Sequence, residues 1–148
     1  MRRCAERGAG CPQSPDGAAR RAVSLLIVED ETLLATHIQQ LLEAAGFAVA
    51  GIASSGTEAL LLAGAARCDL VLVDLALAGP LDGRQTALQL GRRFGLPALF
   101  LGPAGKATAP AGDAGALGYV EKPLRPSQLF NALQQALAQL GREGGGAG

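Results

Sequence analysis

The sequence is poor in the residues that many binding functions need. Aromatic residues make up 3% of its 148 residues, tryptophan is absent, and histidine occurs once. The formal net charge is zero, and much of the arginine stands in the first 22 residues rather than across the folded part. A nucleic-acid surface needs clustered Lys and Arg with aromatic side chains for stacking. We therefore expect no nucleic-acid partner.

Long apolar runs and a usable set of cysteines are also missing. No uninterrupted apolar stretch approaches the ~20 residues that cross a membrane, and no apolar segment follows the basic start as it would in a secretory signal. Cys4, Cys11 and Cys68 fit neither a disulfide framework nor paired zinc knuckles. We predict a cytoplasmic protein with free thiols and no membrane partner. The lone His37 is interpreted as a surface or packing residue.

The length suits one domain with one hydrophobic core. Residues 1–22 are rich in Gly, Ala, Pro and Arg without a hydrophobic period, which predicts a disordered leader. Residues 23–140 form the predicted domain, and the Gly-rich residues 141–148 a flexible tail. No output domain or helix-turn-helix follows, which favours a stand-alone module.

Apolar stretches of strand character alternate with helical patterns along the predicted domain. Strands are predicted at residues 24–28, 47–53, 69–74, 97–101 and 117–121, and helices at 31–45, 55–66, 82–94 and 126–140. This alternation predicts an α/β fold of (βα)5 type: a doubly wound, parallel five-stranded sheet in the flavodoxin-like order 2-1-3-4-5.

One connection breaks the alternation. The sequence between Leu101 and Leu117 contains four glycines and two prolines but no large apolar residue. A helix there would have little to bury and several residues that interrupt it. We therefore predict a degraded fourth helix, of at most a turn or two, between Gly102 and Ala116.

Carboxylates follow two of the predicted strands. Glu29, Asp30 and Glu31 come directly after the first, and Asp74 ends the third. In the predicted order these strands are neighbours, and ligands bind outside their carboxyl ends. Two carboxylates about 4 Å apart repel by roughly 4 kcal/mol at an effective dielectric constant of 20. The cluster therefore predicts either raised pKa values or a bound cation, of which Mg²⁺ is the simplest choice.

A positive charge is predicted at the same edge of the sheet. Lys122 follows the fifth strand and precedes Pro123. A lysine in that place is by default solvated, but beside the acidic cluster it becomes a candidate partner for a phosphate or a carboxylate.

Four short motifs, in order, make the chain similar to a known family. They are Ile27-Val28-Glu29-Asp30-Glu31, Leu72-Val73-Asp74, Leu81-Asp82-Gly83 and Gly118-Tyr119-Val120-Glu121-Lys122-Pro123. Over about residues 23–140 the chain resembles the receiver domain of two-component response regulators, in particular chemotaxis-regulator-like receivers.

The resemblance implies roles for the matching residues. They are Asp74 as phosphoacceptor, Glu29, Asp30, Asp74 and the backbone carbonyl of Ala76 as ligands of Mg²⁺, Lys122 as partner of the phosphoryl group, and a cis bond before Pro123. It also implies a histidine kinase or a histidine phosphotransfer protein as donor, and no enzymatic activity beyond self-phosphorylation and self-dephosphorylation. The downstream protein target is not named by the sequence, and a homodimer stays open.

One position departs from the pattern of the family. Receivers that resemble this chain carry Thr or Ser at the end of the fourth strand, coupled to an aromatic residue on the fifth. Here the first of these places is Gly102, whereas Tyr119 matches the second. The resemblance therefore predicts an intact acceptor with atypical switching. Thr108, in the following connection, is a weak candidate for the missing hydroxyl group.

Three functions are compatible with these features to different degrees. The first is a receiver that accepts a phosphoryl group on Asp74 in a phosphorelay. The second is a phosphorylation-independent docking or dimerisation module, which Gly102 favours and the acidic set opposes. The third is an aspartate-nucleophile phosphatase, opposed by Leu75-Ala76 because such enzymes place a second acid two residues after the nucleophile. No glycine-rich phosphate loop follows the first strand, which argues against nucleotide binding.

Overall fold

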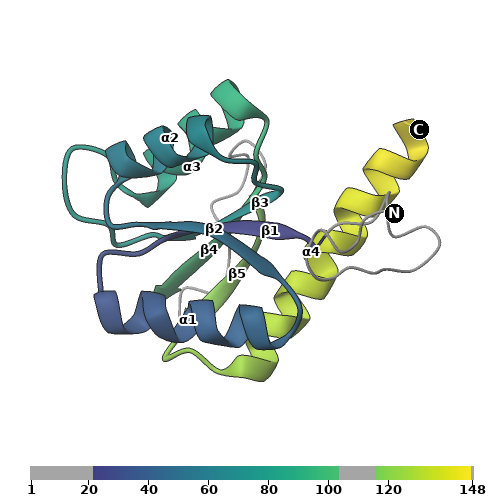
Figure 1. Cartoon of the computed structure of the whole chain (residues 1–148), viewed down its shortest axis with the longest axis horizontal. Helices are drawn as coiled ribbons and strands as arrows, with labels where there is room; N and C mark the ends of the chain where they lie inside the picture. Colours follow the sequence, from purple (N-terminus) through teal and green to yellow (C-terminus); the bar gives the residue numbers. More distant parts are fainter. Residues whose placement is uncertain (1–21, 104–115, 148) are drawn as a thin grey trace, which may run out of the picture.

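The computed structural model describes residues 22–103 and 116–147. Five parallel strands form one sheet in the order β2-β1-β3-β4-β5, which confirms the predicted fold (Figure 1). The strands are β1 (Ser24–Val28), β2 (Ala48–Ala53), β3 (Leu70–Asp74), β4 (Ala98–Pro103) and β5 (Ala116–Lys122). The helices of the described part are α1 (Thr32–Ala44), α2 (Gly56–Ala65), α3 (Gly83–Phe94) and α4 (Pro126–Ala147).

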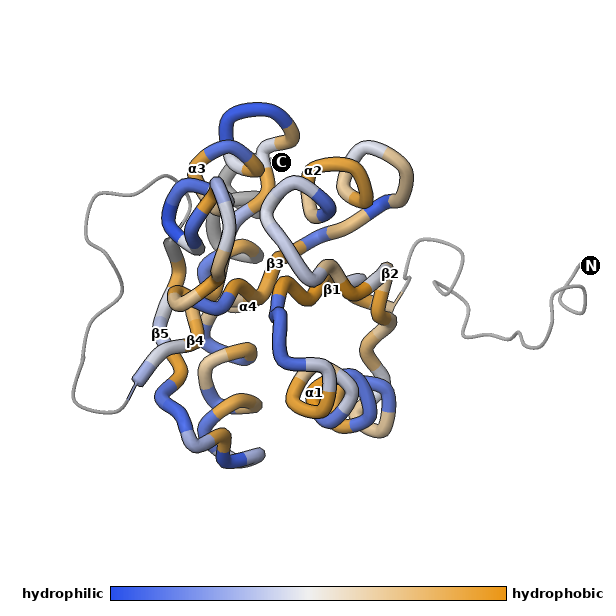
Figure 2. Tube along the Cα trace, turned by 90° about the vertical axis from the view of Figure 1, so that its left-hand side faces the viewer, coloured by the Kyte–Doolittle hydropathy of each residue, from blue (hydrophilic) through white to orange (hydrophobic). Residues whose placement is uncertain are grey.

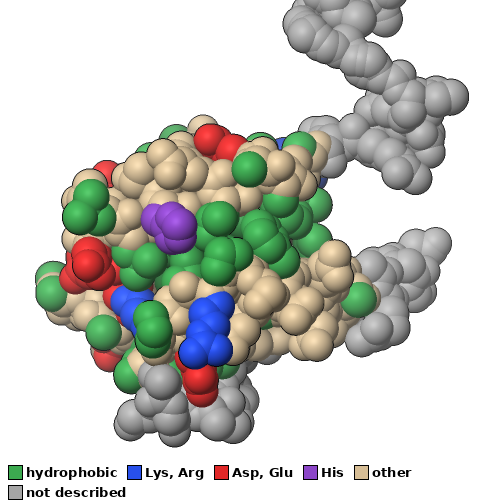
Figure 3. All heavy atoms as spheres, turned by 90° about the horizontal axis from the view of Figure 1, so that it is seen from below, with side chains coloured by type: hydrophobic (Ala, Val, Ile, Leu, Met, Phe, Trp, Pro, Cys, Tyr) green, Lys and Arg blue, Asp and Glu red, His purple; other side chains and the backbone are tan. Residues whose placement is uncertain are grey.

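Helices cover both faces of the sheet. α2 and α3 lie on one face, and α1 and α4 on the other (Figures 1 and 2). Successive side chains of a strand point to opposite faces, so β1 contributes to both cores. Leu25 and Ile27 pack with the buried residues of α1 and α4, whereas Leu26 and Val28 pack with those of α2 and α3. Figure 3 shows the α1 and α4 face, where apolar side chains gather in a band.

Local sequence signals determine where two of the helices begin. The Ser55 hydroxyl accepts a hydrogen bond from the backbone N–H of Glu58 (3.1 Å), although the Glu58 carboxylate binds Ser54 instead of completing a capping box. Asp82 and Gln85 do form a reciprocal capping box, with distances of 2.8 and 3.0 Å. α3 therefore starts immediately after the loop that follows Asp74.

The last helix is longer than predicted. α4 continues past Gly141 to Ala147, so its predicted end at Leu140 is wrong. A glycine inside a helix costs about 1 kcal/mol relative to alanine but does not forbid helical geometry. Arg142 and Glu143, both good helix formers, extend the segment.

Some expectations lie outside the described residues. These are nearly all of the predicted leader, Cys4 and Cys11, the degraded fourth helix, and Thr108. Within the described part, none of the helices combines the length and the apolar character needed to cross a membrane.

Candidate functional site

The pairing of β1 with β3 brings the predicted acidic residues together. Val28 lies opposite Val73 in the parallel register, so Glu29 and Asp74 follow at the same level of neighbouring strands. Glu29 donates its backbone N–H to Ala53 on β2 (2.9 Å), which continues the ladder of the sheet by one residue. The two carboxylates therefore stand on backbone that is held by the sheet.

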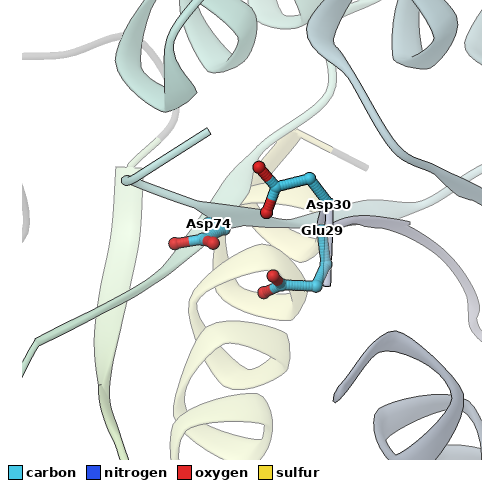
Figure 4. Close-up of side chains that lie close together, drawn as sticks. All are labelled: Glu29, Asp30 and Asp74. Carbon is cyan, nitrogen blue, oxygen red and sulfur yellow. The ribbon is translucent and has the colours of Figure 1, made fainter. Parts of the chain in front are cut away.

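Three carboxylates converge at this edge. One side-chain oxygen from each of Glu29, Asp30 and Asp74 lies within 4.8 Å of the others (Figure 4). Glu29 and Asp74 are each 2% exposed, whereas Asp30 is exposed. The fourth acid of the sequence cluster, Glu31, is exposed, and its contribution is a backbone N–H instead of a carboxylate.

Backbone donors hold each carboxylate in place. Asp74 Oδ1 accepts from the N–H of Ala76 at 3.0 Å, and Glu29 Oε2 accepts from the N–H of Glu31 at 3.0 Å. Asp30 Oδ2 accepts a longer bond, of 3.4 Å, from the N–H of Ala78. Each side chain uses one oxygen in this way. The other oxygens of the cluster are left for a cation or for the lysine.

Lys122 brings one positive charge to the three acids. Its Nζ donates to Asp74 Oδ2 at 3.0 Å and lies 3.4 Å from Glu29 Oε1. Partial burial lowers the pKa of Lys122, but the hydrogen bond and the charge of Asp74, with that of Glu29, outweigh the burial and raise the pKa overall. Lys122 therefore stays charged. The peptide bond between Lys122 and Pro123 is cis, as the resemblance implies.

The donor set fits a hard divalent cation. Glu29 Oε1 is buried and has no hydrogen-bond partner in the described part of the chain, although it faces the Lys122 ammonium as an ion pair. One ammonium group does not balance three ionised carboxylates, and Mg²⁺ prefers oxygen ligands such as these. Glu29, Asp30 and Asp74 could therefore hold a metal, as the sequence predicted. The carbonyl of Ala76 stays a predicted ligand.

Burial changes the acidity of one member of the cluster. The pKa of Glu29 is raised to about 7, chiefly by removal from water; the charge of Asp74 adds to the rise, whereas the backbone N–H of Glu31 and the charge of Lys122 oppose it. Without a cation, the folded protein therefore takes up a proton at the cluster near neutral pH. This is the first of the two solutions that the sequence left open.

The pKa of Glu29 predicts that stability depends on pH when divalent ions are removed. Between about pH 4.5 and 7 the folded chain keeps a proton that the unfolded chain has released. The free energy of unfolding therefore falls by about 3 kcal/mol as the pH rises through this window, and then levels off. Urea unfolding in a chelating buffer from pH 4.5 to 8 measures the change.

Matched variants separate Glu29 from the other acids. Glu29→Gln has no carboxyl group to titrate at this position, so its free energy of unfolding should be nearly constant over the same pH range. Glu43→Gln removes an exposed carboxylate of α1 and should keep the slope of the wild type. An unchanged slope in Glu29→Gln would contradict the assignment.

The ring of Tyr119 fills the space that a side chain at position 102 would occupy. A Cβ atom at position 102 would overlap the Tyr119 hydroxyl oxygen and would lie 2.8 Å from Cζ and 3.0 Å from Cε1 of the ring. The hydroxyl group donates to the backbone carbonyl of Pro103 at 2.9 Å. The tyrosine thus crosses from β5 to the end of β4, into the place of the missing side chain.

Sequence reasoning missed the close contact made by Gly83. A Cβ atom there would overlap the backbone carbonyl oxygen of Asp74 and would lie 2.7 Å from Cα of Leu75. The sequence signal for this contact was the position of Gly83, directly after the helix cap Asp82 in one of the four family motifs. Two residues that the sequence placed outside the site lie away from it: His37 is exposed on α1, and Cys68 is a half-buried free thiol before β3.

The fold and the site together define a class of protein domain. It is a doubly wound α/β domain with an acidic cluster and a lysine at its topological switch point. The family model of the response regulator receiver domain matches residues 25–134. The chain belongs to this family, whose members are the receiver domains of two-component signalling.

Relatives and solved structures agree with this assignment. The phyllosphere-induced regulator PhyR of Methylorubrum extorquens is 32% identical over 123 residues, which are 81% of this chain and 45% of that protein. The transcriptional regulatory protein PdtaR of Mycobacterium tuberculosis is 32% identical over 126 residues, covering 84% and 60%. This chain thus spans about half the length of these relatives. A CheY-like receiver from Methanospirillum hungatei superposes with a TM-score of 0.70 at 25% identity, covering 83% of this chain and 99% of that one.

Proposed function

We propose that this receiver accepts a phosphoryl group on Asp74, with Mg²⁺ held beside it. The observation that carries the proposal is the environment of that carboxylate. Asp74 is buried at the end of β3, its two oxygens are bound by Ala76 N–H and Lys122 Nζ, both at 3.0 Å, and two further acids converge on it. A carboxylate fixed between a cation and a metal-binding cluster suits nucleophilic phosphoryl transfer.

The proposed reaction forms one bond and breaks another. A carboxylate oxygen of Asp74 attacks the phosphorus atom of the donor, and a new O–P bond forms. With a phosphohistidine donor the N–P bond breaks, and the imidazole nitrogen leaves with the electron pair. Lys122, already charged at the acceptor, pairs with the negative oxygens of the transferred group.

The metal would supply neutralisation of the phosphoryl oxygens when bound. Glu29, Asp30 and Asp74 are its proposed protein ligands, together with the carbonyl of Ala76. Phosphoryl transfer leaves little covalent work to the protein, so positioning and charge are its main contributions. In this chain the backbone N–H groups of Glu31, Ala76 and Ala78 do the positioning.

The proposed donor is a histidine kinase or a histidine phosphotransfer protein, acting within a phosphorelay. Membership of the receiver family supports this choice. We also propose that switching is atypical, since position 102 carries no hydroxyl group.

Chemical phosphorylation of the wild-type chain tests the proposal. Acetyl phosphate and Mg²⁺ should add one phosphoryl group, detected by intact mass, and chelation of the metal should prevent the addition. Hydroxylamine should remove the group, because an acyl phosphate is labile to this nucleophile. A chain that stays unmodified under these conditions would overturn the proposal.

A docking module that works without phosphorylation is the second candidate. The observation that favours it is Gly102, which removes the side chain of the usual switch position. Under this function the chain would bind its partner equally well with and without acetyl phosphate. Retained phosphoryl uptake together with unchanged partner binding would support it.

A further inference from the structure

A side chain at position 102 and the observed position of the Tyr119 ring exclude each other, so the ring can lie there only beside a glycine. We propose that Gly102 holds Tyr119 inward at the end of β4 as a fixed part of the phosphoacceptor site, whatever the state of Asp74. This inference goes beyond the proposed function, since it concerns which parts of the site can move.

The first support is the contact between Gly102 and the tyrosine ring. A Cβ atom on Gly102 would overlap the phenolic oxygen and come within 2.8 Å of Cζ and 3.0 Å of Cε1. Real Cβ atoms do not approach ring carbons so closely. The ring therefore stands on the backbone of Gly102, in space that every other residue type would occupy with its own side chain.

The second support is a hydrogen bond to the adjacent residue. The Tyr119 hydroxyl donates to the carbonyl oxygen of Pro103 at 2.9 Å. One side chain of β5 thus contacts two consecutive residues of β4. Rotation of Tyr119 outward would leave the space above Gly102 empty and the hydroxyl group without this partner.

The contact between Gly102 and Tyr119 lies next to the proposed acceptor, Asp74. Asp74 lies opposite Leu101 in the register of β3 and β4, so Gly102 is the next residue beyond the acceptor on the neighbouring strand. Partial burial raises the pKa of the Tyr119 phenol, and the charges of Glu121 and Asp74 raise it further. The phenol thus lies within the electric field of the site.

A fixed tyrosine leaves the other contacts of Asp74 and its neighbours to respond to phosphorylation. These are the Lys122 ammonium and the N–H donors of Ala76 and Ala78, in the loop between β3 and α3, and of Glu31 at the start of α1. Resting on the proposed function, this part of the inference assigns the response to those two loops and to the Lys122 side chain, and excludes the Tyr119 side chain.

The composition of the chain provides a direct test. Tyr119 is its single tyrosine, and tryptophan is absent, so intrinsic fluorescence reports on this side chain alone. In the wild type, quenching of this fluorescence by acrylamide should be well below that of the urea-unfolded chain. Complete phosphorylation, followed by intact mass, should leave the quenching unchanged.

Gly102→Ala tests the exclusion without any phosphorylation. The added methyl group meets the far end of a flexible side chain, so the variant should fold with Tyr119 turned outward. Its acrylamide quenching should rise by roughly twofold, because a new rotamer exposes the ring. Gly64→Ala, where a Cβ atom meets Phe94 at an ordinary 3.6 Å, is the matched control and should quench like the wild type.

Each outcome decides between the alternatives. Quenching in folded Gly102→Ala that equals the wild type would overturn the exclusion. Quenching in the wild type that changes with phosphorylation, or that already equals the unfolded chain, would overturn the fixed position. If intact mass shows no phosphoryl uptake, the proposed function has failed, whereas the variant and the unfolded reference still decide the position of Tyr119.

Discussion

Replacing Asp74 by Asn should reduce phosphoryl uptake from acetyl phosphate by on the order of 100-fold or more, because an amide is a poor nucleophile. The variant keeps the size of the side chain and one acceptor for the Ala76 N–H (3.0 Å in the wild type). It also removes one of three crowded negative charges. The free energy of unfolding in a metal-free buffer should therefore change little, because the relief of this repulsion offsets the lost ion pair with Lys122. Intact mass and urea unfolding measure the two effects.

Asp69→Asn is the matched control for this experiment. Asp69 immediately precedes the same strand, at its opposite end, where its carboxylate accepts from the backbone N–H of Ser24 at 2.9 Å. An asparagine oxygen can still accept that bond. The control should therefore take up phosphate like the wild type. Equal labelling of the wild type and Asp74→Asn would show that the acceptor is another residue.

Gly83→Ala should destabilise the protein by about 3 kcal/mol, which is the range of severe overpacking in a well-packed structure. The new Cβ atom would overlap the carbonyl oxygen of Asp74 and lie 2.7 Å from Cα of Leu75. These are backbone atoms, so no side-chain rotation can relieve the contact. Either α3 moves away from the end of β3, or the loop that carries the acceptor is displaced. Urea unfolding at a fixed pH measures the loss.

The control for Gly83→Ala is again Gly64→Ala. Gly64 lies in the last turn of α2, and a Cβ atom there would make only ordinary contacts with Phe94. Alanine is the better helix former, so this variant should gain about 0.5 kcal/mol. The opposite signs would show that the loss belongs to the site at position 83 rather than to the exchange of glycine for alanine. A loss below the error of unfolding in Gly83→Ala would contradict the close packing.

Much of the fold follows from local patterns in the sequence. The run from Leu70 to Val73 is apolar, as expected of a strand that is covered on both faces. The strand ends at Asp74, whose carboxylate lies at the edge of the sheet. The order of the strands follows from alternation and handedness. This order is what places Glu29 next to Asp74, so the acidic cluster could be predicted from the sequence.

Other features depend on packing that no local pattern records. The place of the Tyr119 ring depends on the absence of a side chain at position 102, seventeen residues earlier in the sequence. The sequence reported a missing hydroxyl group, but not that another side chain fills the space. Similarly, glycines in a predicted tail suggested the end of a helix, whereas α4 continues through Gly141. Weak propensities are overridden by a helix that is already formed.

The pairing of Lys122 with Asp74 also bears on the order in which the domain is built. The two residues are 48 positions apart in the chain. Domains are synthesised from the amino terminus, so the strands that carry Glu29 and Asp74 leave the ribosome well before the lysine that compensates their charge. Until β5 joins the sheet, the nascent chain holds converging acids without their counter-charge. Addition of the fifth strand therefore brings the Lys122 ammonium to the acids and lessens the repulsion among them.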